Sequence, residues 1–299
     1  MVYLVKIGDI VSRKSYAMDV LFRVIDIKPG NSGSSGNSGN KENICLLKGI
    51  DYRIQADAPE SDLVVRNCTD VNTCRSALMS RIDKKTRMLY VQSDLHRSKK
   101  AYLRDTPKES ARKLARPGKV LHLDGDDSYM STCQNEYSKM GIDAICKFAP
   151  EKEQSAVVYR LLAENRPDIV VMTGHDGMSK NISDRDDLNS YKNSKYFIDA
   201  VKEARRYDPD LNGLAIFAGA CQSCYPQLIR AGANFASAPG RILIHALDPV
   251  LVSQKLAYTA FDKVLTPNEV IGNTMSGLDG IGGMQIRGKY RDVFPADLY

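Results

Sequence analysis

The sequence predicts an α/β protein with a mostly parallel sheet sandwiched by helices, preceded by a small all-β module. From residue 119 onwards, short apolar runs alternate with segments of helical periodicity, which is typical of βαβ units. Before residue 66, short β-branched runs follow one another with only turn residues between them. In the α/β region, two apolar runs end in His175 and Cys221, 46 residues apart.

The N-terminal module is expected to span residues 1–65. Its apolar runs at 10–12, 20–27 and 44–49 are separated by turn residues and predict short strands. Several strands in so short a segment favour a small β-barrel of the SH3-like type. Residues 30–40 contain only Gly, Ser and Asn, so they cannot bury surface and should be flexible. Their composition is that of an engineered linker in place of a natural loop.

Residues 66–117 are predicted to form a basic helical connector. Residues 81–119 hold 13 Lys and Arg against 4 Asp and Glu, a balance of +9, whereas the whole chain carries +6. Such a stretch can attract nucleic acid. It lacks the regularly interleaved aromatic residues of a single-strand binder, so we expect a solvated connector without a nucleic-acid partner. Tyr90 and Tyr102 leave the alternative open.

The third region is expected to begin at Pro117-Gly118 and to run from 118 to 299. Its parallel strands are predicted at 119–123, 142–148, 169–172, 214–218 and 241–245. The helices between them are predicted to end near 139, to span 150–165, 195–206 and 223–231, and to begin again near 249. The glycine-rich run 277–283 is predicted to be a loop.

Composition excludes several classes of protein. No apolar run reaches the roughly 18 residues that a membrane span needs, and residues 1–9 lack the layout of a signal peptide. We therefore expect a cytoplasmic protein without a membrane partner. Seven cysteines, an odd number in a chain of this length, do not indicate a disulfide framework. The lone Cys221-Gln-Ser-Cys224 motif lacks further ligands at zinc-site spacing, so no metal or cofactor is predicted.

Cys221 and His175 are the candidate catalytic pair. Ligands and reactive groups in open α/β sheets gather at the carboxyl ends of the strands, where both residues are expected. A cysteine nucleophile needs a nearby base or positive potential to form its thiolate. His175 supplies the base, and the helix expected after Cys221 supplies backbone N–H groups. This pattern predicts a cysteine protease.

Other residues offer weaker alternatives. Cys224 lies one helical turn beyond Cys221 and is the rival nucleophile, and His245 ends a late predicted strand and is the rival base. His122 lies inside a predicted strand and is expected in the core, whereas His96 lies in the connector. A redox role for the CxxC pair is a third alternative.

Two motifs resemble the caspase–gingipain–legumain clan of cysteine proteases. In that clan, the catalytic His follows one apolar strand as His-Gly and the catalytic Cys follows the next as Ala-Cys. Thr173-Gly-His175 and Gly219-Ala-Cys221 match this pattern in type, order and separation. The resemblance implies a caspase-like sheet. One departure is Asp176, which stands where the clan has Gly directly after His.

Several longer segments resemble one family, the YabG sporulation-specific proteases. The resemblance covers nearly the whole chain apart from 30–40, and the segments that carry it are 8–16 (GDIVSRKSY), 120–126 (VLHLDGD), 173–177 (TGHDG), 217–224 (FAGACQSC) and 232–240 (GANFASAPG). The resemblance implies a mother-cell cytoplasmic protease, associated with the spore coat, that processes spore coat and cortex proteins and itself. It also implies cleavage next to basic residues.

The resemblance also implies roles for individual residues. Cys221 would be the nucleophile and His175 would protonate the leaving amine. The oxyanion donors would be the backbone N–H of Cys221 and one at Asp176 or Gly177. A basic P1 side chain needs a carboxylate, for which Asp126 and Asp127 are candidates because the clan uses that strand end. The alternative is that they cap the following helix.

Asp176 is a further candidate for the P1 carboxylate, or for orienting His175. The competing function is a regulatory protein that binds nucleic acid or a partner and carries a vestigial protease-like domain. The sequence indicates no oligomeric state.

Overall fold

The structure is a computed structural model in which the chain divides into two compact units, Met1–Ile82 and Asp83–Tyr299. It describes residues 4–29, 42–67, 114–178, 186–240 and 242–293, with single helical positions at 69, 71, 72, 76, 80 and 84. The tract 30–40 and most of the predicted connector therefore lie outside the described residues.

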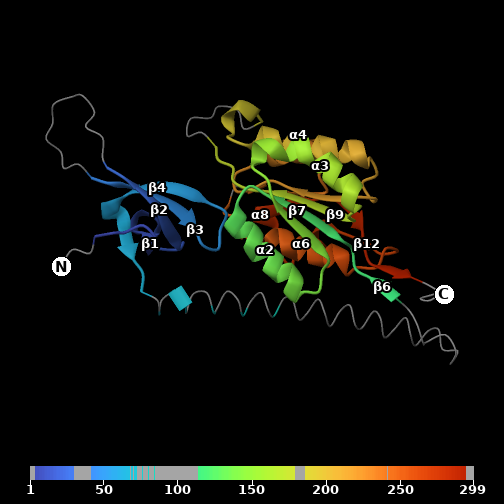
Figure 1. Cartoon of the computed structure of the whole chain (residues 1–299), viewed down its shortest axis with the longest axis horizontal. Helices are drawn as coiled ribbons and strands as arrows, with labels where there is room; N and C mark the ends of the chain where they lie inside the picture. Colours follow the sequence, from blue (N-terminus) through green and yellow to red (C-terminus); the bar gives the residue numbers. More distant parts are fainter. Residues whose placement is uncertain are drawn as a thin grey trace. The chain divides into compact units, whose positions relative to one another are not determined.

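The first unit is an antiparallel sheet of five strands in the order β4-β3-β2-β1-β5 (Figure 1). They are β1 (Ile10–Arg13), β2 (Phe22–Lys28), β3 (Ile44–Gly49), β4 (Gln55–Pro59) and β5 (Leu63–Val65). The three strands expected from the sequence are confirmed. The short 3₁₀ helix η2 (Glu60–Asp62) joins the two edge strands, and Val11, Val24 and Leu47 are buried.

The second unit contains a sheet of six strands in the order β13-β11-β10-β9-β7-β8. Five run parallel and β13 runs antiparallel to β11. They are β7 (Val120–Asp124), β8 (Ala144–Phe148), β9 (Ile169–Thr173), β10 (Ala215–Ala218), β11 (Phe235–Ser237) and β13 (Ile281–Gly283). The alternation of strands and helices after residue 119 therefore builds a mostly parallel sheet, as predicted.

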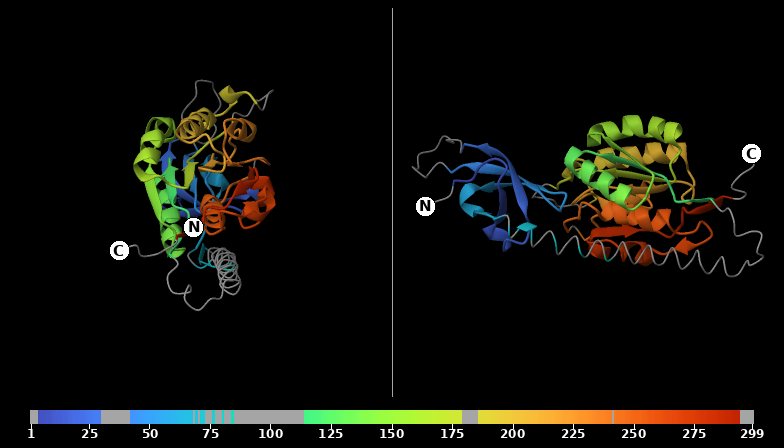
Figure 2. Two further views of the ribbon diagram at one scale, coloured as in Figure 1. Left: turned by 90° about the vertical axis from the view of Figure 1, so that its right-hand side faces the viewer. Right: turned by 60° about the horizontal axis from the view of Figure 1, so that its bottom comes forward.

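Helices cover both faces of this sheet (Figures 1 and 2). Because strand side chains alternate between faces, Leu121 and Leu123 pack toward one layer and His122 toward the other. The first layer holds α3 (Glu151–Asn165), α4 (Ser194–Tyr207) and α5 (Tyr225–Arg230). The second layer holds α2 (Asp127–Lys139) and α6 (Asp248–Ala257).

Two predictions for the C-terminal part were wrong. Residues 242–244 form no regular strand, and the fifth parallel strand is β11 instead. The run 277–283 is not a loop but helix α8 (Gly277–Gly280) followed by β13. Gly282 and Gly283 are explained by close packing, because a Cβ at Gly282 would collide with the ring of Tyr225 and one at Gly283 with the ring of Phe235.

The remaining elements lie at the margins of the second unit. Strand β6 (Leu114–Arg116) lies within the predicted helical connector and pairs with β15 (Arg291–Val293). Strand β12 (Val264–Leu265) pairs with β14 (Ile286–Arg287), and α7 (Pro267–Ile271) and η3 (Leu188–Ser190) are short helices. Across the described part of the chain, no helix has the length and apolarity that crossing a bilayer requires.

Candidate active site

The two candidate residues follow neighbouring strands at the same edge of the sheet. Strand β10 pairs in parallel with β9, with Ala218 opposite Met172, and Gly219 N–H extends the pairing by donating to the Met172 carbonyl at 3.0 Å. His175 comes two residues after the end of β9, and Cys221 three residues after the end of β10. The prediction that both lie at the carboxyl edge is therefore confirmed.

Cys221 lies on a tight turn. Gly219 and Gln222 on either side of it have left-handed backbone angles, with φ of 106° and 61°. Gly219 is required there because a Cβ would also press against the Leu228 side chain. Ser223 closes the turn, since its N–H donates to the Ala220 carbonyl and its Oγ accepts the Ala220 N–H at 2.9 Å. The turn fixes where the thiol lies.

The thiol of Cys221 is buried and in contact with backbone. The Ile244 N–H donates to Sγ at 3.2 Å, and the residue is 2% exposed. An N–H group aimed at sulfur favours the thiolate over the thiol. Helix α5 begins at Tyr225 with Cys224 as its N-cap, so the donor at Cys221 comes from the 242–247 loop rather than from the helix terminus expected.

His175 is held by Asp126. The His175 Nε2 lies 2.8 Å from Asp126 Oδ2, and both side chains are largely buried. The other oxygen, Asp126 Oδ1, accepts the N–H groups of Ser128 and Tyr129 at the start of α2. The helix-cap interpretation of Asp126 is confirmed, and its pairing with His175 was not anticipated. Asp127 is exposed in the first turn of the same helix.

Glu151 is a site residue that the sequence did not reveal. Its Oε1 accepts the His175 N–H at 2.7 Å, and its carboxylate lies over Gly125 and Gly174, where a Cβ on either would collide with it. The only signal in the sequence was a glycine after each of two strands. Glu151 thus joins the loop after β7 to the loop after β9.

Asp176 is partly buried directly after His175, and its carboxylate bonds to other groups than the imidazole. Its carboxylate accepts hydrogen bonds from Gly177 N–H, Asn193 N–H, Ser194 Oγ and Ser223 Oγ. Burial raises the pKa of Asp176 above its usual value, and these four hydrogen bonds offset only part of that rise. Gly177 N–H is therefore already engaged. Among the residues that the structure describes, Asp176 N–H has no acceptor, which makes it the better oxyanion donor of the two.

Sequence comparison assigns the family. The model of the YabG peptidase U57 family matches residues 6–295. The chain is 42% identical over 291 residues to the sporulation-specific protease YabG of Bacillus subtilis (strain 168). The aligned residues cover 97% of this chain and 98% of the Bacillus protein. The chain belongs to the YabG peptidase family. It is thus a member of a family of sporulation proteases. No solved structure matches it.

The rival residues of this YabG-family chain lie next to the site. Cys224 is fully buried, and its N–H donates to Ser194 Oγ at 2.8 Å. His245 is 2% exposed, and its Nδ1 accepts the Leu247 N–H at 3.1 Å. The His245 ring is therefore bonded within its own loop through Nδ1. The preceding residue, Ile244, donates its N–H to Cys221 Sγ.

A buried polar cluster on β7, β9 and α2 lies next to the site. The ligand atoms of His122, Asp124 and Cys133 lie within 4.8 Å of one another, close enough to suggest a metal site. However, His122 Nε2 is 2.9 Å from Thr173 Oγ1, which donates to Asp124 Oδ2 at 3.1 Å. Asp124 Oδ1 accepts the Asp126 N–H. The cluster is therefore bonded internally and anchors the residue that holds His175.

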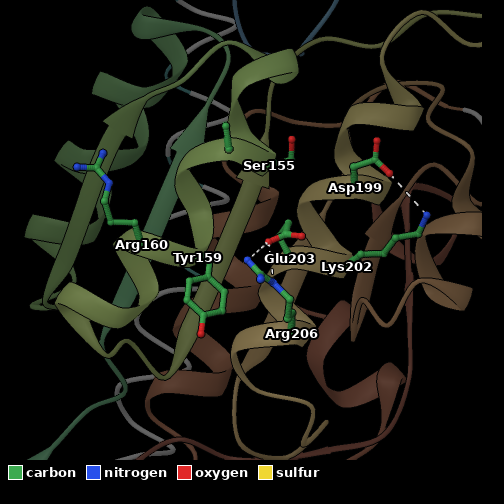
Figure 3. Close-up of a pocket in the computed structure, with 8 residues that line it drawn as sticks. Ser155, Tyr159, Arg160, Asp199, Lys202, Glu203 and Arg206 are labelled. Carbon is green, nitrogen blue, oxygen red and sulfur yellow. Dashed lines mark hydrogen bonds and ion pairs between the residues drawn. The ribbon is translucent and has the colours of Figure 1, made fainter.

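A separate pocket lies on the outer surface of α3 and α4 (Figure 3). It has a volume of about 510 Å³ and lies over the helix layer rather than at the strand ends. Arg206 bonds Glu203 at 2.6 Å and stacks over the Tyr159 ring at 4.4 Å, and Lys202 pairs with Asp199. Its lining residues come from α3 and α4, away from the loops that carry His175 and Cys221, so it is not part of the candidate active site.

Proposed function

We propose that this YabG-family chain is a cysteine endopeptidase with Cys221 as nucleophile and His175 as general acid and base. The observation that carries the proposal is the His175–Asp126 pair, which lies at the same sheet edge as the Cys221 turn. The N–H donated to Cys221 Sγ adds the electrostatic support that a thiolate needs.

The reaction follows from these positions. The Cys221 thiolate attacks the scissile carbonyl carbon, and the backbone N–H groups of Cys221 and Asp176 stabilise the oxyanion. Because Nε2 is held by Asp126, His175 Nδ1 is the nitrogen that protonates the leaving amine. Water then attacks the thioester and gives a proton to His175, and the C–S bond breaks to release the new carboxyl group and restore the Cys221 thiolate. Asp126 stabilises the imidazolium and fixes its orientation.

The fold supports a caspase-like architecture for this catalytic unit. Five parallel strands followed by one antiparallel edge strand, with the candidate His and Cys after adjacent central strands, fit the resemblance to that clan. The first unit, with strand order β4-β3-β2-β1-β5 and a 3₁₀ turn before its last strand, fits an SH3-like barrel. We infer that this barrel binds or regulates rather than catalyses.

The proposed substrates are spore coat and cortex proteins, and the chain itself, cut next to basic residues in the mother-cell cytoplasm. Recognition of a basic P1 residue needs a carboxylate that is available to the substrate. Asp126 uses both oxygens within the protein, whereas Asp127 is exposed at the same strand end. We therefore assign the P1 contact to Asp127 in preference to Asp126.

The test compares Cys221→Ala with Cys224→Ala, using hydrolysis of peptides that carry Arg, Lys or Ala at P1. We expect Cys221→Ala to lower kcat by about 10⁴-fold or more, as loss of a nucleophile does in other proteases. Cys224→Ala should keep kcat within a few-fold of wild type.

Full activity in Cys221→Ala would exclude the proposed nucleophile. Equal losses in both variants would favour CxxC redox chemistry instead. Steeply salt-dependent DNA binding, together with no hydrolysis, would favour the regulatory alternative.

A further inference from the structure

We propose that Asp176 is a positioning residue that ties the His175 loop to the turn carrying Cys221. The inference deepens the proposed function and rests on it. It starts from one observation: a partly buried carboxylate directly follows the candidate base and accepts four hydrogen bonds, none of them from the imidazole.

Each oxygen of Asp176 holds a different part of the site. Oδ1 accepts the backbone N–H groups of Gly177 and Asn193, both at 2.8 Å. Asn193 in turn donates from Nδ2 to the His175 carbonyl at 2.8 Å. This half of the carboxylate therefore fixes the backbone on both sides of Asp176 itself.

Oδ2 reaches the nucleophile turn through two serine hydroxyls. Ser223 Oγ donates to it at 2.9 Å and accepts the Ala220 N–H at 2.9 Å. Ser194 Oγ donates to it at 2.5 Å and accepts the Cys224 N–H at 2.8 Å. Each serine hydroxyl thus links the Asp176 carboxylate to a backbone N–H, one on either side of Cys221.

These contacts are charge-assisted and partly buried, so they are stronger and more directional than fully exposed hydrogen bonds. A second link between the loops is weaker, since the Met178 N–H donates to Gln222 Oε1 at 3.2 Å. Positioning matters here because displacement of a reacting group by about 1 Å can cost about 10²-fold in rate. Removing the carboxylate should therefore lower kcat rather than substrate affinity.

The experiment measures kcat and KM of Asp176→Asn, Ser223→Ala and the double variant on the Arg-P1 peptide. Asp187→Asn is the matched control, because Asp187 is an exposed acid that caps η3, and within the described residues its carboxylate accepts hydrogen bonds from Asn189 alone. Asp176→Asn keeps an acceptor for the two N–H groups but loses the acceptor for the two hydroxyls.

We expect kcat to fall about 10- to 100-fold in Asp176→Asn and about 10-fold in Ser223→Ala, with KM changing less than about threefold. The double variant should be no slower than Asp176→Asn alone, because both substitutions break one path. If Asp176→Asn loses its cooperative unfolding transition, the test rests on kcat of Ser223→Ala, which removes a single hydroxyl.

Multiplying effects in the double variant, losses mainly in KM, or wild-type kcat in both single variants would overturn the inference. These outcomes differ from failure of the proposed function, which would leave Cys221→Ala active whatever the Asp176 variants do.

Discussion

The carboxyl and amino edges of the six-stranded sheet use their charged side chains for different purposes. At the carboxyl edge, Asp126, Glu151 and Asp176 each bond to a loop that carries His175 or Cys221. At the amino edge, Asp168 bonds Arg116 at 2.8 Å and the Lys119 N–H at 2.9 Å, both next to the start of β7.

Lys289 is the second anchor of the amino edge. It is 1% exposed, and its Nζ donates to the Asn212 and Gly213 carbonyls at 2.6 and 2.9 Å, just before β10. It therefore attaches the C-terminal segment to the start of a central strand.

Mutations at the two edges should therefore affect different properties of the protein, catalytic rate at one edge and stability at the other. Carboxyl-edge charges hold groups that must meet a substrate, so altering them should change rate. Amino-edge charges join one strand or segment to another, so altering them should change stability and leave kcat alone.

The sharpest way to break this contrast is Asp126→Asn against Asp168→Asn. Asparagine can still cap α2 through its Oδ1. However, the Nδ2 group that replaces Asp126 Oδ2 cannot accept a hydrogen bond from His175 Nε2. We expect kcat to fall about 10²- to 10⁴-fold in Asp126→Asn with an almost unchanged melting temperature. Asp168→Asn should lower the melting temperature and keep kcat.

Steady-state kinetics and calorimetry on the same preparations check both variants. A normal kcat in Asp126→Asn would mean that the pair with His175 plays no part in proton transfer. A large loss of kcat in Asp168→Asn would show that the two edges are not separable.

The sequence predicted the positions of His175 and Cys221 because buried strands are recognised as short apolar runs. The end of each run then marks the carboxyl end of its strand. It did not predict the Asp126–His175 bond, since side-chain direction across 49 residues is set by the packing of α2. Glu151 and the serine relays of Asp176 were missed for the same reason. Strand β13 was missed because its glycines, which resemble a loop, are there to accommodate Phe235 and Tyr225.

A smaller effect is expected from a matched pair of glycines. A Cβ at Gly174 would collide with the Glu151 carboxylate, and a Cβ at Gly213 with the Asp208 carboxylate. Gly174→Ala should displace Glu151 from the His175 N–H and lower kcat about 10-fold. Gly213→Ala should cost about 1 kcal/mol of stability with kcat unchanged. Equal kinetic losses in both would count against the contrast between the edges.

The last expected effect concerns pH at the amino edge. Burial lowers the pKa of Lys289 from 10.5 to about 8, so between these values the unfolded chain holds more protons than the folded one. The free energy of unfolding should therefore rise with pH across this window, by about 1–2 kcal/mol between pH 7.5 and 9.5. Urea denaturation should show this rise in the wild type and a flatter response in Lys289→Met, while kcat at pH 7.5 stays the same. Parallel pH responses in the two proteins would mean that Lys289 is not a buried charge, and the amino edge would then rest on Asp168 alone.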